Sequence, residues 1–424
     1  MSLINKEILM ACFLALATAC SSEVVSSQFL VKRSPRSKKP LPSDDPRNRK
    51  VTELDLPEIT SEIQAFALAA RDVRDETNPV DIRYLSIAHQ KASGVSAEDL
   101  KAVEHAVGKL FNSLSWQPQI TAVRSIDSLG LLFKIKLSEF GWDANLWNIL
   151  ASGHPASPDS IPGVNELQRF TGSDKPLLRA DWVMRSASQP PLYYKLIRVP
   201  SNVTDLLKGL NISAQANINA GRVIRAGFER SAVSTNHRVI ERHDLAKGFL
   251  WRSYEFRNKN GNRNIFDFPL GPAANSGGIS ILNGVLPPSG NANNGSGPLF
   301  PGQAFVSDGS EIYFTLPNGM LGFYIAGAEG LRINEVPGTD EKKIVAGISC
   351  FSCHSKGTMP ARDEVAKRTR VTGAALDAVR RIYSSDEVLE ATLKSDSQFY
   401  LNALSQIGIS ADGVEPINAV VRMQ

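Results

Sequence analysis

The sequence has little net charge, no long apolar run and only four cysteines. A net charge of +4 over 424 residues is too weak for charge-driven nucleic-acid binding, which needs a concentrated basic face. No apolar run reaches the roughly 18 residues of a membrane-spanning helix, so a polytopic mature chain is not expected. With 42% apolar and 21% charged residues, the chain can bury a large core, and its length favours two or three domains.

The first twenty residues have the features of an export signal. Residues 8–17 form an apolar stretch that is too short to span a bilayer. The sequence Leu-Ala-Thr-Ala-Cys that ends at Cys20 resembles a bacterial lipobox, which implies that Cys20 carries a lipid anchor after cleavage. The Ser21 that follows implies, by the same resemblance, a location in the bacterial cell envelope on the outer membrane, facing the periplasm. Ordinary signal-peptidase cleavage after Ala19 is the alternative, and it also exports the chain.

The rest of the chain divides into three segments by composition. Residues 21–50 are rich in serine, proline and basic side chains without a structural period, which predicts a disordered tether. Residues 51–341 are expected to form an α+β domain of unknown function, with a helical N-terminal part and a β-rich middle. Residues 342–424 are expected to form a C-terminal helical region. The predicted fold class is therefore α+β.

Local patterns predict the elements of the N-terminal part. The spacing of apolar residues indicates helices over 56–73 and 82–92. Ser96 followed by Asp99 has the form of a capping box, which begins the next helix. Residues 131–137 alternate in the manner of a strand.

The middle of the chain shows turn signals and its end shows helical spacing. Asn-Lys-Asn-Gly at 258–261 and Pro-Asn-Gly at 317–319 predict two β-hairpins. Residues 271–302 are rich in Gly, Asn, Ser and Pro, which predicts a long surface loop. From Val365 onward the pattern is helical again.

Residues 350–354 contain the string C-x-x-C-H, a c-type haem attachment motif. Two thiols three residues apart on one helical turn, Cys350 and Cys353, can both form thioethers with one haem, and His354 can then supply an axial nitrogen to the iron. The small Gly347 ahead of them is expected to let the backbone approach the flat macrocycle. Two alternatives are a Cys350–Cys353 disulfide and a zinc site, which would still need a fourth ligand.

The residues after this motif carry a family resemblance. A glycine at position 357 and the pair Met-Pro at 359–360 resemble c-type cytochrome domains. Further segments resemble a group of poorly characterised exported bacterial proteins with one such motif, at 179–182, 191–194, 241–243, 316–319 and 412–416. This resemblance covers roughly residues 80–420 and implies a cytochrome c-like region with covalent haem c and its iron, without a known substrate.

The second axial ligand of the iron is open at this point. Met359 lies five residues after His354, and about 17 Å of extended chain would have to pass round the haem edge and return, which argues against it. Met423 lies near a terminus that is expected to fray. His243, from the preceding domain, is therefore the expected distal ligand, and a five-coordinate iron is the alternative.

Other polar residues have weaker interpretations. Arg179 and Asp181 beside Trp182 are expected to be a buried ion pair rather than the lining of a pocket. Three arginines can either meet haem propionates or form a solvated surface, namely Arg222, Arg225 and Arg230.

Two functions from different classes remain. The first is a lipid-anchored monohaem electron-transfer protein that serves an unidentified redox partner protein. The second is a haem enzyme, such as a peroxidase, in which the large non-haem part builds a substrate pocket over an open iron. An envelope structural protein with haem as a staple is a third. We expect electron transfer.

Overall fold

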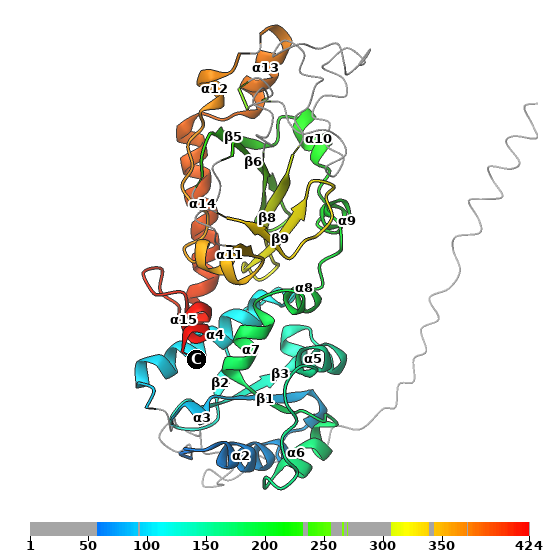
Figure 1. Cartoon of the computed structure of the whole chain (residues 1–424), viewed down its shortest axis with the longest axis vertical. Helices are drawn as coiled ribbons and strands as arrows, with labels where there is room; N and C mark the ends of the chain where they lie inside the picture. The colour runs from blue at the N-terminus through cyan, green and yellow to red at the C-terminus, as the bar shows by residue number, and fades with distance from the viewer. Residues whose placement is uncertain are drawn as a thin grey trace, which may run out of the picture. The chain divides into compact units, whose positions relative to one another are not determined.

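The computed structural model describes residues 57–91, 94–231, 236–255, 265–266, 269, 307–338, 343–370 and 372–423. The expected export signal, the tether, the turn at 258–261 and the loop over 271–302 lie outside these ranges. Thr52–Gln424 form one compact unit. Helices and sheets are both present, so the predicted mixed α+β class is confirmed at that level (Figure 1).

The N-terminal part contains a four-stranded sheet in the order β2-β3-β1-β4. Its strands are β1 (Ile82–Ser86), β2 (Arg124–Ser125), β3 (Leu132–Lys136) and β4 (Leu177–Arg179). Strand β1 runs antiparallel to β3 and parallel to β4, and all five of its residues are buried. The helix expected over 82–92 is therefore wrong in its first half, and only α3 (Ala88–Lys91) is helical. A short apolar run that is covered on both faces has no period that separates strand from helix.

Helices surround this sheet. Helix α2 (Glu62–Arg74) begins after Ser61, later than expected. Helix α4 (Ala97–Ser113) begins with the predicted capping box, because the Ser96 hydroxyl accepts from the Asp99 amide and the Asp99 carboxylate accepts from the Ser96 amide. The other elements of this part are η3 (Pro79–Asp81), η4 (Leu137–Phe140), α5 (Ala144–Ala151), α6 (Val164–Thr171), α7 (Ala180–Ala187) and α8 (Leu192–Ile197).

The second sheet is a five-stranded antiparallel meander. Its strands are β5 (Ile224–Phe228), β6 (Arg238–Asp244), β7 (Phe249–Glu255), β8 (Gly309–Thr315) and β9 (Leu321–Gly327), paired in that order. The predicted hairpin at 317–319 joins β8 to β9. Its turn needs Gly319, which has a φ of 88°. The flanking elements are α9 (Val203–Gly209), α10 (Ala214–Asn219), β10 (Glu335–Pro337) and β11 (Lys343–Val345).

The C-terminal helices pack on both preceding parts. They are α11 (Ile348–Cys353), α12 (Val365–Arg368), α13 (Gly373–Ile382), α14 (Asp386–Ser405) and α15 (Pro416–Arg422), so the helical pattern expected after Val365 is confirmed. Helix α15 lies against α4 and α7, and α14 contacts β5 (Figure 1). A buried ion pair between Lys109 and Glu415 joins α4 to α15. The same Glu415 caps α15 by accepting from the Ile417 amide at 3.0 Å.

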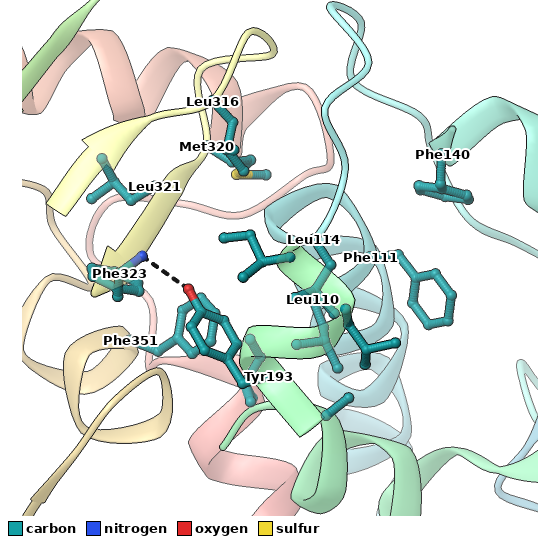
Figure 2. Packing of buried hydrophobic residues seen from close by; sticks show 14 of the residues in the cluster. Leu110, Phe111, Leu114, Phe140, Tyr193, Leu316, Met320, Leu321, Phe323 and Phe351 are labelled. Carbon is teal, nitrogen blue, oxygen red and sulfur yellow. Dashed lines mark hydrogen bonds between the residues drawn. The ribbon is translucent and has the colours of Figure 1, made fainter. Parts of the chain in front are cut away.

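The apolar core is continuous between these parts. Figure 2 shows Phe351 of α11 beside Phe323 of β9 and Tyr193 of α8. The Tyr193 hydroxyl accepts from the Phe323 amide at 2.9 Å, which joins α8 to the second sheet. Each fully buried ring of this kind contributes about 1.5–3 kcal/mol. Among the described residues, no helix combines the length and apolar character needed to cross a bilayer.

Candidate functional site

Helix α11 carries the C-x-x-C-H motif, and its side chains face two different environments. Phe351 is buried in the core, whereas Cys350, Cys353 and His354 line a cavity. Gly347 is the N-cap of this helix, with a φ of 79°, and a Cβ at this position would lie 2.2 Å from the Ser188 carbonyl oxygen. The close approach of this glycine is thus to the end of α7, around Ser188.

The cavity has a volume of about 410 Å³, within the range of small-molecule and cofactor sites. One wall is a face of the second sheet, where Trp251, Tyr313 and Phe323 are cross-strand neighbours on β7, β8 and β9. The other wall is α11 with the segment 359–362 and Leu393 of α14. A flat, largely apolar group can therefore be enclosed between an aromatic sheet face and the thiol-bearing helix.

The imidazole of His354 has a defined tautomer. Its Nδ1 lies 3.0 Å from the Gly357 carbonyl oxygen, which can only accept, so Nδ1 carries the proton and Nε2 keeps its lone pair. Burial lowers the pKa of His354, which keeps the imidazole neutral at ordinary pH. The Tyr313 ring lies against it with a centroid separation of 4.3 Å. A second ring nitrogen fixed by a carbonyl is the usual arrangement of a metal-ligating histidine.

Gly357 fixes that acceptor carbonyl against α14. Its φ is 97°, and a Cβ there would lie 2.7 Å from the Cα of Ser397. Next to it, Thr358 donates from its hydroxyl to the Leu393 carbonyl at 2.7 Å. The sequence identified this glycine only by resemblance, and the structure supplies its physical reason.

Both thiols of the motif are free, and burial raises the pKa of each. They are therefore protonated at neutral pH, whereas redox-active C-x-x-C dithiols depend on a lowered thiol pKa. Within the described ranges, no group of three or more His, Cys, Asp or Glu side chains is placed to hold a metal ion. The raised thiol pKa values argue against a redox-active dithiol at this position.

The structure does not bring His243 to this cavity. Strand β6 alternates, so Arg238 and Ile240 line the cavity while His243 lies on the other face of the sheet. His243 is buried there, with Nε2 2.8 Å from the Glu241 carboxylate and Nδ1 3.3 Å from the Asn217 amide. Its role as expected distal ligand is therefore corrected to that of a hydrogen-bonded core residue.

The two methionines considered at the sequence level differ in position. Met359 lines the cavity that contains His354 and is 38% exposed. Met423 follows α15 and packs against the core beside that helix. Of the two, the structure therefore places only Met359 within the cavity wall.

The three arginines considered as partners for haem propionates lie in different environments. Arg230 lines the cavity, whereas Arg225 is fully buried in an ion pair with Glu241 on the opposite sheet face. The exposed Arg222 donates to the Asn217 side chain at 3.1 Å. Far from this site, Asp181 is buried and accepts from Arg179 and His89, in agreement with the expected ion pair.

Two cavity residues were missed at the sequence level. Arg238 of β6 and Glu311 of β8 form an ion pair, with Nη1 3.1 Å from Oε2, and both line the cavity. Glu311 lies two residues before Tyr313 on β8 and therefore on the same sheet face, but the sequence did not indicate which strand would neighbour it. No family model, no curated protein and no solved structure matches this chain.

Proposed function

We propose that this chain is an exported, lipid-anchored monohaem c-type cytochrome that transfers electrons. The observation that carries the proposal is that Cys350, Cys353 and the neutral imidazole of His354 line one cavity beside an aromatic sheet face. Haem, when bound, supplies a reversible one-electron iron couple. The surrounding protein supplies the axial nitrogen, the apolar walls and the charges that tune that couple.

The residues of this chain fit covalent haem by their chemistry. Each protonated thiol can add across one vinyl group to form a thioether, with its hydrogen transferred to the vinyl carbon. Nε2 of His354 can ligate iron because Nδ1 is held by Gly357. Arg230 and Arg362 are exposed parts of the cavity lining, where guanidinium groups can pair with propionates.

The location of the protein is proposed from its N-terminal sequence. The lipobox-like segment ending at Cys20, followed by the polar tether over 21–50, supports attachment to the outer membrane facing the periplasm. Cys20→Ser should release the protein from washed membranes into the soluble envelope fraction. Retention of this variant in the membrane after a high-salt wash would contradict a lipid anchor.

A haem enzyme with an open iron is the second candidate. Among the described cavity-lining residues, His354 has the one imidazole and Met359 the one thioether. Met359 also follows His354 after only five residues, which restricts its reach to the opposite haem face. These observations favour an accessible iron face.

The test of covalent haem uses the full chain matured with haem-attachment machinery. Wild type should show a c-type pyridine haemochrome and an intact mass increased by one haem. Cys350→Ala with Cys353→Ala should lose both signals. Ser352→Ala, at an exposed position between the two thiols, should keep both. Haem mass retained in the double variant would contradict thioether attachment.

A further inference from the structure

The Arg238–Glu311 pair is the strongest polar feature of the cavity. The Arg238 side chain is 6% exposed and bonds two carboxylates, Glu311 at 3.1 Å and Glu255. Glu311 is anchored through its backbone amide, which donates to the Ser253 hydroxyl at 2.9 Å. Its negative charge favours the protonated forms of Cys350, Cys353 and His354. The pair therefore lies within electrostatic reach of the haem-binding residues.

One N–H donor of the Arg238 guanidinium has no hydrogen-bond acceptor among the described residues. This donor, Nε, is buried. A buried N–H without a partner costs about 1–3 kcal/mol, so an acceptor that enters the cavity gains by meeting it. Arg238 already neutralises two carboxylates, Glu255 and Glu311, so a haem propionate would be a third carboxylate on one guanidinium. That crowding favours a ligand that enters uncharged.

We propose that Glu311 and Arg238 form a binding site for small weak acids of the form HX, the class of hydrogen cyanide and hydrogen peroxide, in the cavity that Cys350, Cys353 and His354 also line. This inference rests on the proposed haem attachment and adds a ligand class to that site.

The chemistry of the pair follows from its donors and acceptors. HX enters neutral and gives its proton to a carboxylate oxygen of Glu311, so the H–X bond breaks and an O–H bond forms. The anion X⁻ keeps the bonding electron pair and accepts a hydrogen bond from Nε of Arg238. Charge is conserved, since Glu311 loses its negative charge as X⁻ gains one. No oxidant or reductant takes part.

Cyanide binding to the ferric, haem-loaded protein tests this inference, followed by stopped-flow absorption of the haem band. Glu311→Gln keeps shape but cannot take the proton, so the association rate should fall by about a hundredfold. Glu255→Gln is the matched control, because Glu255 bonds the same guanidinium but is not part of this cavity wall. It should leave the rate unchanged. Arg238→Lys should raise the dissociation rate of cyanide, because lysine has no equivalent of Nε.

Carbon monoxide binding to the ferrous protein separates proton transfer from access. This ligand carries no proton, so Glu311→Gln should leave its association rate unchanged. Equal slowing of cyanide and carbon monoxide, or equal effects of Glu311→Gln and Glu255→Gln, would overturn the inference. So would a wild-type protein that binds neither probe. The haemochrome assay reports covalent haem independently, so the two proposals can fail separately.

Discussion

The ammonium group of Lys109 lies 5.7 Å from the centre of the Phe351 ring and forms a buried ion pair with Glu415. Lys109 is on α4, Phe351 is inside the C-x-x-C-H motif on α11, and Glu415 is the N-cap of α15. Tyr400 of α14 places a second ring at the same distance from Lys109. A single buried cation on α4 thus contacts α11, α14 and the N-terminus of α15.

Removal of this cation should destabilise the whole unit. Lys109→Met leaves the Glu415 carboxylate buried without its counter-ion, so the free energy of unfolding should fall by about 3–5 kcal/mol. Urea unfolding measures it. Lys367→Met is the control, because the Lys367–Asp386 pair is exposed and its loss should cost far less stability. Equal losses in the two variants would show that burial does not decide the effect.

Gly357 should tolerate no side chain. Gly357→Ala combines an unfavourable positive φ with a clash against Ser397, so we expect a loss of stability of at least about 1–3 kcal/mol and a lower haem yield. Gly373→Ala is the control, because Gly373 also has a positive φ, 57°, but has open space around it. The difference between the two isolates the close approach to α14. Normal haem loading in Gly357→Ala would refute the role assigned to its carbonyl.

His243→Ala should leave the iron coordination unchanged. The variant removes a hydrogen-bond partner of the buried Glu241 on the far sheet face, so stability should fall by about 1–3 kcal/mol. The ferric absorption and electron paramagnetic resonance spectra should match those of wild type. Met359→Leu is the comparison variant, because the Met359 side chain lines the cavity that contains His354 whereas His243 does not. A change from low-spin to high-spin iron in His243→Ala alone would restore His243 as a ligand.

His154 should make stability depend on pH. Burial lowers the pKa of His154, and the charges of Lys175 and Arg179 act in the same direction, while the hydrogen bond to the Pro155 carbonyl opposes them. The neutral ring accepts from the Arg179 amide at 3.2 Å. The unfolded chain then binds more protons below its unfolded pKa of about 6.5, so stability is lost as pH falls through that value toward the folded pKa. Urea midpoints at neutral and acidic pH measure the loss. In His154→Gln this loss should be smaller, and an identical loss would contradict the assignment.

Features encoded by neighbouring residues could be predicted from the sequence. The capping box at Ser96, the hairpin turn before Gly319 and the C-x-x-C-H order each depend on residues within five positions of one another. Strand β1 could not be predicted in the same way, because its burial on both faces depends on β3 and β4.

The sequence predicted the wall of the cavity that α11 forms, with Cys350, Cys353 and His354, but not the wall that the second sheet forms. Chain-reach arguments favoured His243 over Met359, but they did not include the alternation of β6, which turns His243 away. The pairing of Arg238 with Glu311 joins residues 73 positions apart. Only the sheet brings them together, and their roles could not be read from local spacing.

The two walls of the cavity have a consequence for the order of maturation. Cys350 lines a cavity with strands that lie up to about 120 residues earlier in the chain, so the enclosed site exists only after folding. An enzyme that attaches haem to both thiols would need access to them before α11 packs beside the second sheet. Haem loading would then act as a checkpoint, and a chain that folds first would be sealed in an unloaded form.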